Sequence, residues 1–366
     1  MMLSLDKEPI SHMIKGNEKI LILEFRGFGD AIIKTSLVIS LAKSFPEMKI
    51  DLFARPSFKD IFANNPYVNK AYFGELPMLR GDRFSFEHSM DFLHSLIRLR
   101  KNKYDICLNS IGDFRENTIG FLINPQKNIS VMWDKGHPFK YLIREGGTFL
   151  IHNHILIPEH IVNIYEINHF IVKALGGKYF LPPKLYVKNI NENRVRKSLQ
   201  IIGIHPLARQ ACRLWDFEKW CLLCEKLRER DFVVWIFCAS VEKNFIQEKF
   251  GRILKEGDIT IQAGSLNDFF EKLLQIDLLI GLDSLSSHAA YACNVPSIIL
   301  VGPSDDRVWK VPANSQLVHK RDSCNHYPCF TRAKCGGKDY EYICMKSIQV
   351  QDVMENVEEM FKDMRR

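Results

Sequence analysis

No continuous run of about 18 apolar residues occurs in the sequence, so a transmembrane helix is not expected. The first 18 residues contain acidic side chains and no unbroken apolar core, which argues against a secretory signal peptide. We expect residues 1–18 to form a flexible leader. Blocks of basic residues interleaved with aromatic ones are also absent, which argues against nucleic acid as a partner. The sequence therefore predicts a cytoplasmic protein.

Cysteines are present, but not in the pattern of a disulfide scaffold. The chain has 10 of them, and a cytoplasmic chain rarely forms structural disulfides. Cys107, Cys221, Cys224 and Cys238 lie in apolar or helical patterns, where a free thiol packs as a small hydrophobe. Four others share one loop-like segment without the C-x2-C pairs of common zinc modules: Cys324, Cys329, Cys335 and Cys344. These four are candidate ligands for a structural zinc or iron ion, and a reduced, metal-free loop or opportunistic disulfides are the alternatives.

The composition is that of a globular protein, with 46% hydrophobic and 25% charged residues. A chain of 366 residues is long enough for two domains of ordinary size. Apolar strand-like runs alternate with helical patterns in both halves, which predicts an α/β fold. The net charge of +7 suits phosphorylated substrates or an anionic glycolipid acceptor, and it fits peripheral contact with the inner membrane surface.

The stretch from 278 to 305 carries the clearest functional pattern. Residues 278–281 are apolar and predict a buried parallel strand, and a polar turn at 283–287 precedes a helical pattern from His288 to Cys293. Ser286 or Ser287 is expected to cap that helix, and residues 297–301 form the next strand. A helix that starts at the carboxyl end of a parallel strand offers free N–H groups and a positive dipole end to phosphate. An ordinary capped helix is the alternative.

A second turn of interest follows the first predicted strand, residues 19–24. Gly27 and Gly29 allow a tight turn before a helix from about Ala31 to Ser44. The third glycine of a dinucleotide-binding fingerprint is missing, so that motif is only weakly supported. Asp30, at the helix start, serves either as a cap and dipole partner or as an exposed carboxylate for chemistry, and the two roles can coexist.

Cations between 100 and 150 are candidates for binding an anionic acceptor. A basic helix is expected within 78–104 and a strand at 104–109, after which Arg115 is the most useful cation. Residues 131–148 are expected to form a mobile acceptor loop with Lys135, Lys140 and Arg144, although a solvated surface loop is equally consistent. A helix is expected at 156–176.

Three groups of residues together resemble glycosyltransferase family 9, the ADP-heptose:lipopolysaccharide heptosyltransferases. In the first half the resemblance rests on Arg26, Gly29, Asp30 and the Phe45-Pro46 pair, and at the start of the second half on His205, Arg213, Trp215 and Trp220. The most specific match lies in the 278–305 stretch and its flank: Asp283, Ser284, His288, Ala290, Pro296, Gly302, Pro303, Asp305 and Trp309. The family usually has glycine where this chain has Leu285, and another glycine in the turn at 239–242.

This resemblance implies an α/β fold of the GT-B type, with two Rossmann-like domains facing a central cleft. It implies domains at 19–183 for the acceptor and 201–347 for a nucleotide-sugar, joined by a linker at 184–200 and followed by a C-terminal helix at 348–366. The donor implied is ADP-heptose and the reaction is an inverting transfer that requires no cofactor or metal. Another nucleotide-sugar, as in an epimerase or another hexosyltransferase, and a catalytically silent scaffold are the alternatives.

The resemblance also implies roles for individual residues. Asp30 matches the proposed catalytic base, and Arg26 and Arg115, with Lys140 and Arg144, are candidates for acceptor binding. Glu242 is expected to hydrogen-bond the nucleotide ribose. The remaining donor-binding candidates surround the pyrophosphate: Arg213, Asp283, Ser284, Ser286, Ser287 and His288.

Overall fold

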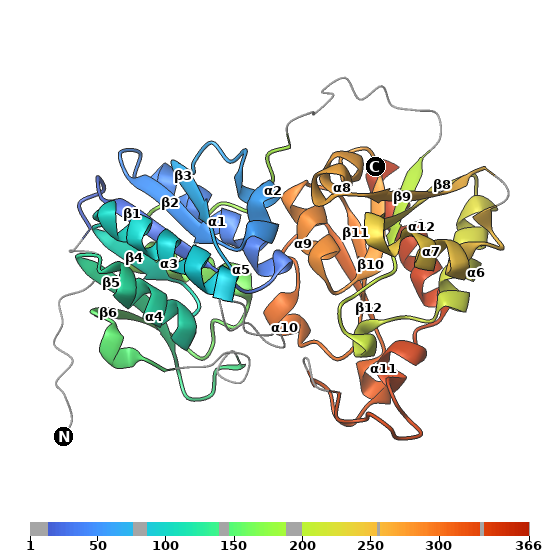
Figure 1. Cartoon of the computed structure of the whole chain (residues 1–366). Helices are drawn as coiled ribbons and strands as arrows, with labels where there is room; N and C mark the ends of the chain where they lie inside the picture. The colour runs from blue at the N-terminus through green and yellow to red at the C-terminus, as the bar shows by residue number, and fades with distance from the viewer. Residues whose placement is uncertain are drawn as a thin grey trace. The chain divides into compact units, whose positions relative to one another are not determined.

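The computed structural model describes residues 14–75, 86–138, 146–187, 200–254, 257–329 and 333–365. The chain divides into two compact units, residues 1–186 and 187–366. Each unit is built around one parallel sheet of six strands, with helices packed on its faces (Figure 1). The predicted α/β class is confirmed.

The N-terminal sheet has the strand order β3-β2-β1-β4-β5-β6. Helix α1 packs against α5 and α3 against α4, and Figure 1 shows α3 and α4 in front of the sheet. The elements of this unit are β1 (Lys19–Glu24), α1 (Phe28–Ser44), β2 (Lys49–Ala54), α2 (Lys59–Phe62), β3 (Lys70–Phe73), α3 (Phe86–Lys101), β4 (Ile106–Asn109), α4 (Phe114–Ile123), β5 (Lys127–Trp133), β6 (Asn153–Ile157) and α5 (Ile164–Ala174).

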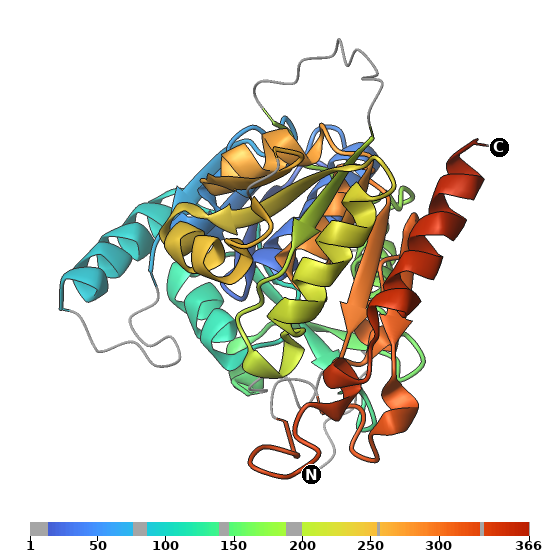
Figure 2. The ribbon, with the colours of Figure 1, turned by 90° about the vertical axis from the view of Figure 1, so that its right-hand side faces the viewer.

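The C-terminal sheet has the order β12-β11-β10-β7-β8-β9. Its elements are β7 (Ile201–His205), α6 (Phe217–Arg228), β8 (Val233–Ala239), α7 (Lys243–Phe250), β9 (Ile259–Gly264), α8 (Leu266–Leu273), β10 (Leu278–Leu282), α9 (Leu285–Ala292), β11 (Ser297–Val301), α10 (Asp306–Trp309), β12 (Ser315–His319), α11 (Ile343–Lys346) and α12 (Val350–Arg365). Helix α12 runs along the outside of this unit (Figure 2). It packs against α6, β11 and β12 and contributes Val353, Val357 and Phe361 to the core.

Both sheets have the same topology, that of the classic Rossmann fold. The first strand of each unit pairs on one side with the second and on the other with the fourth, so the strand order reverses between β1 and β4 and again between β7 and β10. Ligands of open α/β sheets bind outside the carboxyl ends of the strands at this reversal. The turns after β1, β4, β7 and β10 are therefore where a site is expected.

Several expected elements were misplaced. The region 131–148 begins inside β5 rather than as a loop, because Val131 and Trp133 are buried strand residues. The helix expected at 156–176 is the end of strand β6 followed by the shorter α5. Sequence reasoning also missed β12. By contrast, Cys221 and Cys224 are buried core residues of α6, as predicted.

Candidate active site

Asp30 lies on the first turn of α1, directly after the turn that leaves β1. Its carboxylate is mostly covered and lies 3.6 Å from the Nε atom of Arg26. Gly27 occupies the N-cap position in an extended conformation, and a Cβ atom there would stand only 3.0 Å from Oδ2 of Asp30. The glycine therefore leaves room for the carboxylate, and the helix start holds it at the carboxyl end of β1.

A buried group of ionisable side chains, which sequence reasoning missed, lies beside this turn. Glu24 ends β1, Lys34 lies on α1, and Glu116 lies on α4; the Lys34 Nζ atom is 3.4 Å from Oε2 of Glu24. Burial, together with the charge of Glu24, raises the pKa of Glu116 to about 8. Lysine and glutamate inside helical and strand patterns give no sequence signal that they will meet in the core.

Of the acceptor-binding candidates Arg115, Lys140 and Arg144, the structure describes only Arg115. Arg115 forms a bidentate pair with Asp113, the N-cap of α4, through Nε–Oδ1 at 2.8 Å and Nη2–Oδ2 at 2.9 Å. Burial raises the pKa of Asp113, but hydrogen bonds and charge from Arg115 outweigh it and lower that pKa below its usual value. Lys140 and Arg144 lie outside the described residues.

In the C-terminal unit, Arg213 and Asp283 are brought together after β10. The Nη1 atom of Arg213 donates to the backbone oxygen of Asp283 at 2.8 Å and lies 3.5 Å from its Oδ2 atom. The guanidinium is thereby fixed next to the start of α9, with about a fifth of its side chain exposed. An arginine held in this way is suited to bind a phosphate with its remaining donors.

The start of α9 differs from the expected one. Ser284, not Ser286 or Ser287, occupies the N-cap position, and the helix runs from Leu285. The hydroxyls of Ser284 and Ser286 are 3.1 Å apart, while the Ser287 hydroxyl donates to the backbone oxygen of Ser284 at 2.8 Å. The hydroxyls thus bond within the turn rather than cap it, because the polar run continues one helical turn into α9.

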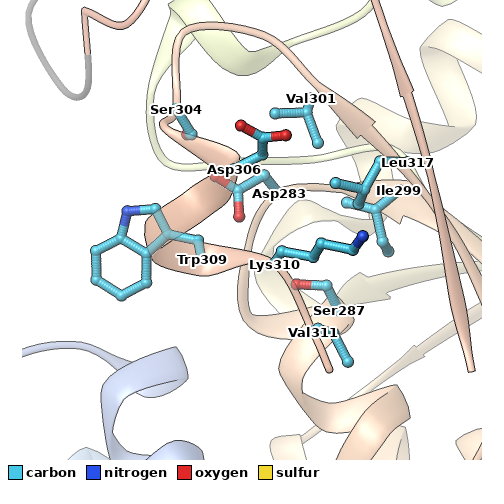
Figure 3. A pocket seen from close by; sticks show the side chains of 10 residues that line it. All are labelled: Asp283, Ser287, Ile299, Val301, Ser304, Asp306, Trp309, Lys310, Val311 and Leu317. Carbon is cyan, nitrogen blue, oxygen red and sulfur yellow. The ribbon is translucent and has the colours of Figure 1, made fainter. Parts of the chain in front are cut away.

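A pocket opens beside this helix start (Figure 3). Residues of the donor motif line it together with residues of β11, α10 and β12; the set is Asp283, Ser287, Ile299, Val301, Ser304, Asp306, Trp309, Lys310, Val311 and Leu317. Figure 3 shows the Lys310 side chain extending toward Ile299 and Leu317, whereas the indole of Trp309 points away from the other labelled side chains. The Trp309 and His288 rings face each other edge to face, with centroids 6.4 Å apart.

Two further features of this unit were not predicted. Asp306 accepts hydrogen bonds from Tyr327 at 2.9 Å and from Arg321 at 2.9 Å. Burial raises the pKa of Asp306, but these partners lower it to a net value below the usual one. His205 ends β7 beside β10, and burial lowers its pKa to about 4, so the ring is neutral at pH 7.

Glu242 caps the chain after β8. Its Oε2 atom accepts a hydrogen bond from the backbone N–H of Ala239 at 2.9 Å. Ala239 has an ordinary extended conformation, so this turn needs no glycine.

The cysteines of the 324–344 segment are all free thiols. The Cys329 thiol donates to the backbone oxygen of His326 at 2.9 Å, and the Cys335 sulfur accepts from the backbone N–H of Tyr342 at 3.3 Å. Burial, with a contribution from Cys324, raises the pKa of Cys344 to about 11, so this thiol is neutral. Within the described part of the chain, no group of three or more His, Cys, Asp or Glu side chains is arranged to hold a metal.

The sequence pattern of glycosyltransferase family 9 (heptosyltransferase) matches residues 94–338, more than half of the chain. The chain belongs to this glycosyltransferase family. A lipopolysaccharide heptosyltransferase 3 of Escherichia coli is 26% identical over 311 residues, which cover 80% of this chain and 86% of the relative. The match confirms the family that the sequence motifs indicated.

Solved structures of family members share the fold of this glycosyltransferase. The E. coli heptosyltransferase WaaC with ADP has a TM-score of 0.72 at 14% identity, covering 93% of this chain and 99% of that one. WaaC with ADP-2-deoxy-2-fluoro heptose has a TM-score of 0.70 at 15% identity and the same coverage. The iron-containing dodecameric glycosyltransferase TibC of enterotoxigenic E. coli has a TM-score of 0.58 at 12% identity, covering 94% of this chain and 79% of that one. The two Rossmann-like units are thus a GT-B fold.

Across the ranges that the structure describes, no helix has both the length and the apolar character to cross a membrane.

Proposed function

We propose that this glycosyltransferase moves a heptose from ADP-heptose to a lipopolysaccharide-core or related glycan or protein acceptor. Family membership carries the proposal, since the match to the family spans residues 94–338 and includes the whole of α9. WaaC has been solved with ADP and with ADP-2-deoxy-2-fluoro heptose, and the E. coli relative is a lipopolysaccharide heptosyltransferase. The domains proposed at 19–183 and 201–347 would bind the acceptor and the donor respectively.

Asp30 is the proposed general base. It takes the proton of the acceptor hydroxyl while that oxygen attacks the anomeric carbon of the heptose. The bond from this carbon to the phosphate oxygen breaks, and its electrons leave on ADP. A single displacement of this kind inverts the anomeric centre. The carboxylate is held at the helix start, 3.6 Å from the Nε atom of Arg26. General base catalysis of this kind contributes typically about 10²–10⁴-fold to the rate.

The leaving ADP develops negative charge, which must be stabilised in the absence of a required metal. Arg213, fixed by Asp283, and the N–H groups at the start of α9 are the proposed partners of the pyrophosphate. Ser284, Ser286 and His288 complete this donor site, and Glu242 binds the ribose. Arg26 and Arg115 are the proposed acceptor contacts, with Lys140 and Arg144 beyond the described residues, and the acceptor glycolipid would bring the cytoplasmic enzyme to the inner membrane surface.

Thermal shift with ADP, UDP and GDP tests the donor assignment. A ligand at 100 times its Kd stabilises the folded state by about 2.7 kcal/mol, which raises the Tm measurably. We expect ADP alone to raise the Tm. Equal shifts for UDP or GDP would contradict the ADP-heptose assignment, and no shift with any nucleotide would favour a catalytically silent scaffold. The anomeric configuration of the product, read by NMR, tests inversion.

A structural metal on Cys324, Cys329, Cys335 and Cys344 is a separate proposal. After burial, the neighbouring thiols Cys324, Cys335 and Cys329 contribute to the raised pKa of Cys344, and the similar structure TibC is iron-containing. The thiols as arranged do not converge, so the loop would have to rearrange to bind. Elemental analysis of protein purified without a His-tag decides: about one equivalent of zinc or iron supports the site, and less than about a tenth excludes it.

A further inference from the structure

Three ionisable side chains are buried beside the turn that presents Asp30. Glu24 is 0% exposed, and Lys34 and Glu116 are each 2% exposed. They come from three elements, β1, α1 and α4. Charged side chains are almost never fully buried unless they are paired, because removing them from water is costly. The proposed base chemistry needs none of the three, so their burial requires another role.

The two carboxyls hold consecutive backbone amides of the turn. The Oε1 atom of Glu116 accepts from the N–H of Phe25 at 3.2 Å, and the Oε1 atom of Glu24 accepts from the N–H of Arg26 at 2.9 Å. These are the first two residues after β1, where the chain turns toward α1. Each amide thereby gains a side-chain hydrogen-bond partner, and the two contacts fix the path of the backbone. Arg26 and, one helical turn later, Asp30 project from this path.

Lys34 contacts both Glu24 and the residue that follows β4. Its ammonium lies 3.4 Å from Oε2 of Glu24 and hydrogen-bonds the hydroxyl of Ser110, which follows β4. The end of β1, helix α1 and the end of β4 are thereby joined at the reversal of strand order. One ammonium balances only one of the two carboxyls. The ion pairs formed by the described residues include none to Glu116, because Arg26 pairs with Asp30 and Arg115 pairs with Asp113.

We propose that Glu24, Lys34 and Glu116 form a positioning triad for Asp30, in which the carboxyls hold the amides of Phe25 and Arg26 and the Lys34 ammonium balances the charge. The triad contacts no reacting atom and acts through the turn. This inference rests on the proposed role of Asp30 as the base.

The protonation state of the triad follows from its surroundings. The groups that face Glu116 are Glu24 on β1, Lys34 on α1, Arg26 on the turn, Cys107 on β4, and Asp113 and Arg115 on or next to α4. Burial and then the charge of Glu24 raise the pKa of Glu116 to about 8, which Lys34 only partly offsets. Burial raises the pKa of Glu24 as well, and the Lys34 ammonium 3.4 Å away works against that rise, so the two carboxyls titrate as a pair, and one proton held between them leaves the triad neutral.

Two substitutions at one position separate the hydrogen bond from the charge. Glu116→Gln keeps a carbonyl oxygen for the N–H of Phe25, whereas Glu116→Leu removes it. We expect faster amide exchange, by mass spectrometry, of a peptide covering residues 24–30 in the Leu variant but not in the Gln variant. The kcat of the Leu variant should fall at least about tenfold with little change in donor KM, and the Gln variant should recover most of it. Glu166→Gln is the matched control, since Glu166 is the exposed third residue of α5 as Glu116 is the third residue of α4.

Stability against pH gives a second readout, which reports whether Glu116 holds its proton in the folded state. The ordinary value for glutamate is 4.5, whereas the folded protein holds the Glu116 proton up to about pH 8. The folded state therefore binds this proton more tightly, and wild-type stability from this group declines as pH rises from 4.5 to 8. Glu116→Gln lacks the titration, so its Tm relative to wild type should increase across this window and then level off. Glu166→Gln should show no such trend.

The outcomes distinguish the triad from the base assignment. The triad is wrong if residues 24–30 of Glu116→Leu exchange their amide hydrogens at the wild-type rate. It is also wrong if the Tm difference between Glu116→Gln and wild type does not change with pH. Either result holds even if Asp30→Asn is inactive. If Asp30→Asn keeps full turnover, the base assignment is wrong, while the exchange and stability results still decide whether the triad holds the turn. Should Glu116→Leu fail to fold, the Tm difference of the Gln variant decides alone.

Discussion

Asp30 depends on a neighbour that has no side chain. The carboxylate oxygen Oδ2 lies only 3.0 Å from the point where a Cβ atom of residue 27 would stand. Gly27 has a φ of −134°, a conformation that any residue can adopt. Glycine is therefore needed here because it has no side chain, and not because of its backbone freedom. The same is true at Gly302, where Met345 packs within 2.6 Å of the missing Cβ atom.

Gly27→Ala should therefore displace the base by a few tenths of an ångström. We expect turnover to fall several-fold, since about 1 Å of misplacement can cost on the order of 10²-fold. The Kd for ADP should not change, because the donor residues lie in the other unit. Gly336→Ala is the control, with no atom closer than 3.8 Å to its new Cβ atom. A Gly27→Ala enzyme as fast as the control would show that the carboxylate position does not limit the reaction.

Arg213 is the residue on which ADP binding is expected to depend most. Arg213→Ala should weaken ADP roughly 10- to 100-fold, because hydrogen bonds to charged groups contribute about 1.5–3 kcal/mol. Arg209→Ala serves as the control, since Arg209 is an exposed residue of the same loop. Isothermal calorimetry of the two variants with ADP is the measurement. Equal affinities would remove Arg213 from the leaving-group site.

At the level of residues, the sequence pointed to side chains that belong to a recognisable motif. It missed side chains whose only distinguishing feature is that they are buried in the folded protein. Asp30, Arg213 and Asp283 were proposed because each follows a strand in a recognisable pattern, and these assignments stay predictions. Glu24 and Lys34 were not, since nothing local in a strand end or a helix interior reveals that two charges will pair inside the core. That information exists only in the pairing of β1 with β4, which brings α4 beside the turn.

At the scale of elements, the start of α9 explains why one family glycine is dispensable. Leu285 is the first residue of the helix, and it is not among the described residues with positive φ. The chain therefore needs no left-handed conformation at this position. The sequence predicted the strand–turn–helix–strand order of this stretch but placed the helix start about three residues late, because three serines compete for the cap.

Leu285→Gly tests this interpretation. Glycine at a helical position is less favourable than alanine by about 0.5–1 kcal/mol, and the half-buried Leu285 side chain is lost as well, so the free energy of unfolding should fall by at least that amount. The ADP affinity should stay within about twofold, because the backbone N–H groups already have the helical arrangement that binds phosphate. Chemical denaturation and calorimetry measure the two quantities. A tenfold gain in ADP affinity would show that the family glycine is needed for close approach to the ligand.

At the scale of the whole molecule, the two units repeat one topology and place their sites alike. In each, the candidate residues lie after the first and fourth strands of the unit, Asp30 and Glu116 in one, Arg213 and Asp283 in the other. Alternation of strands and helices was sufficient to predict the α/β class. The sixth strand of each sheet was not predicted, because β6 and β12 lie at sheet edges and carry a weaker apolar pattern than the central strands.

The release of ADP from ADP-heptose by wild type and Asp30→Asn, in the presence of a lipopolysaccharide-core acceptor, tests the central claim most directly. Asp91→Asn, at an exposed position on α3, is the control. The account predicts that wild type and control turn over alike, that Asp30→Asn is slower by at least about a hundredfold, and that its Kd for ADP stays within about twofold of wild type. Turnover by Asp30→Asn at the wild-type rate would contradict the account.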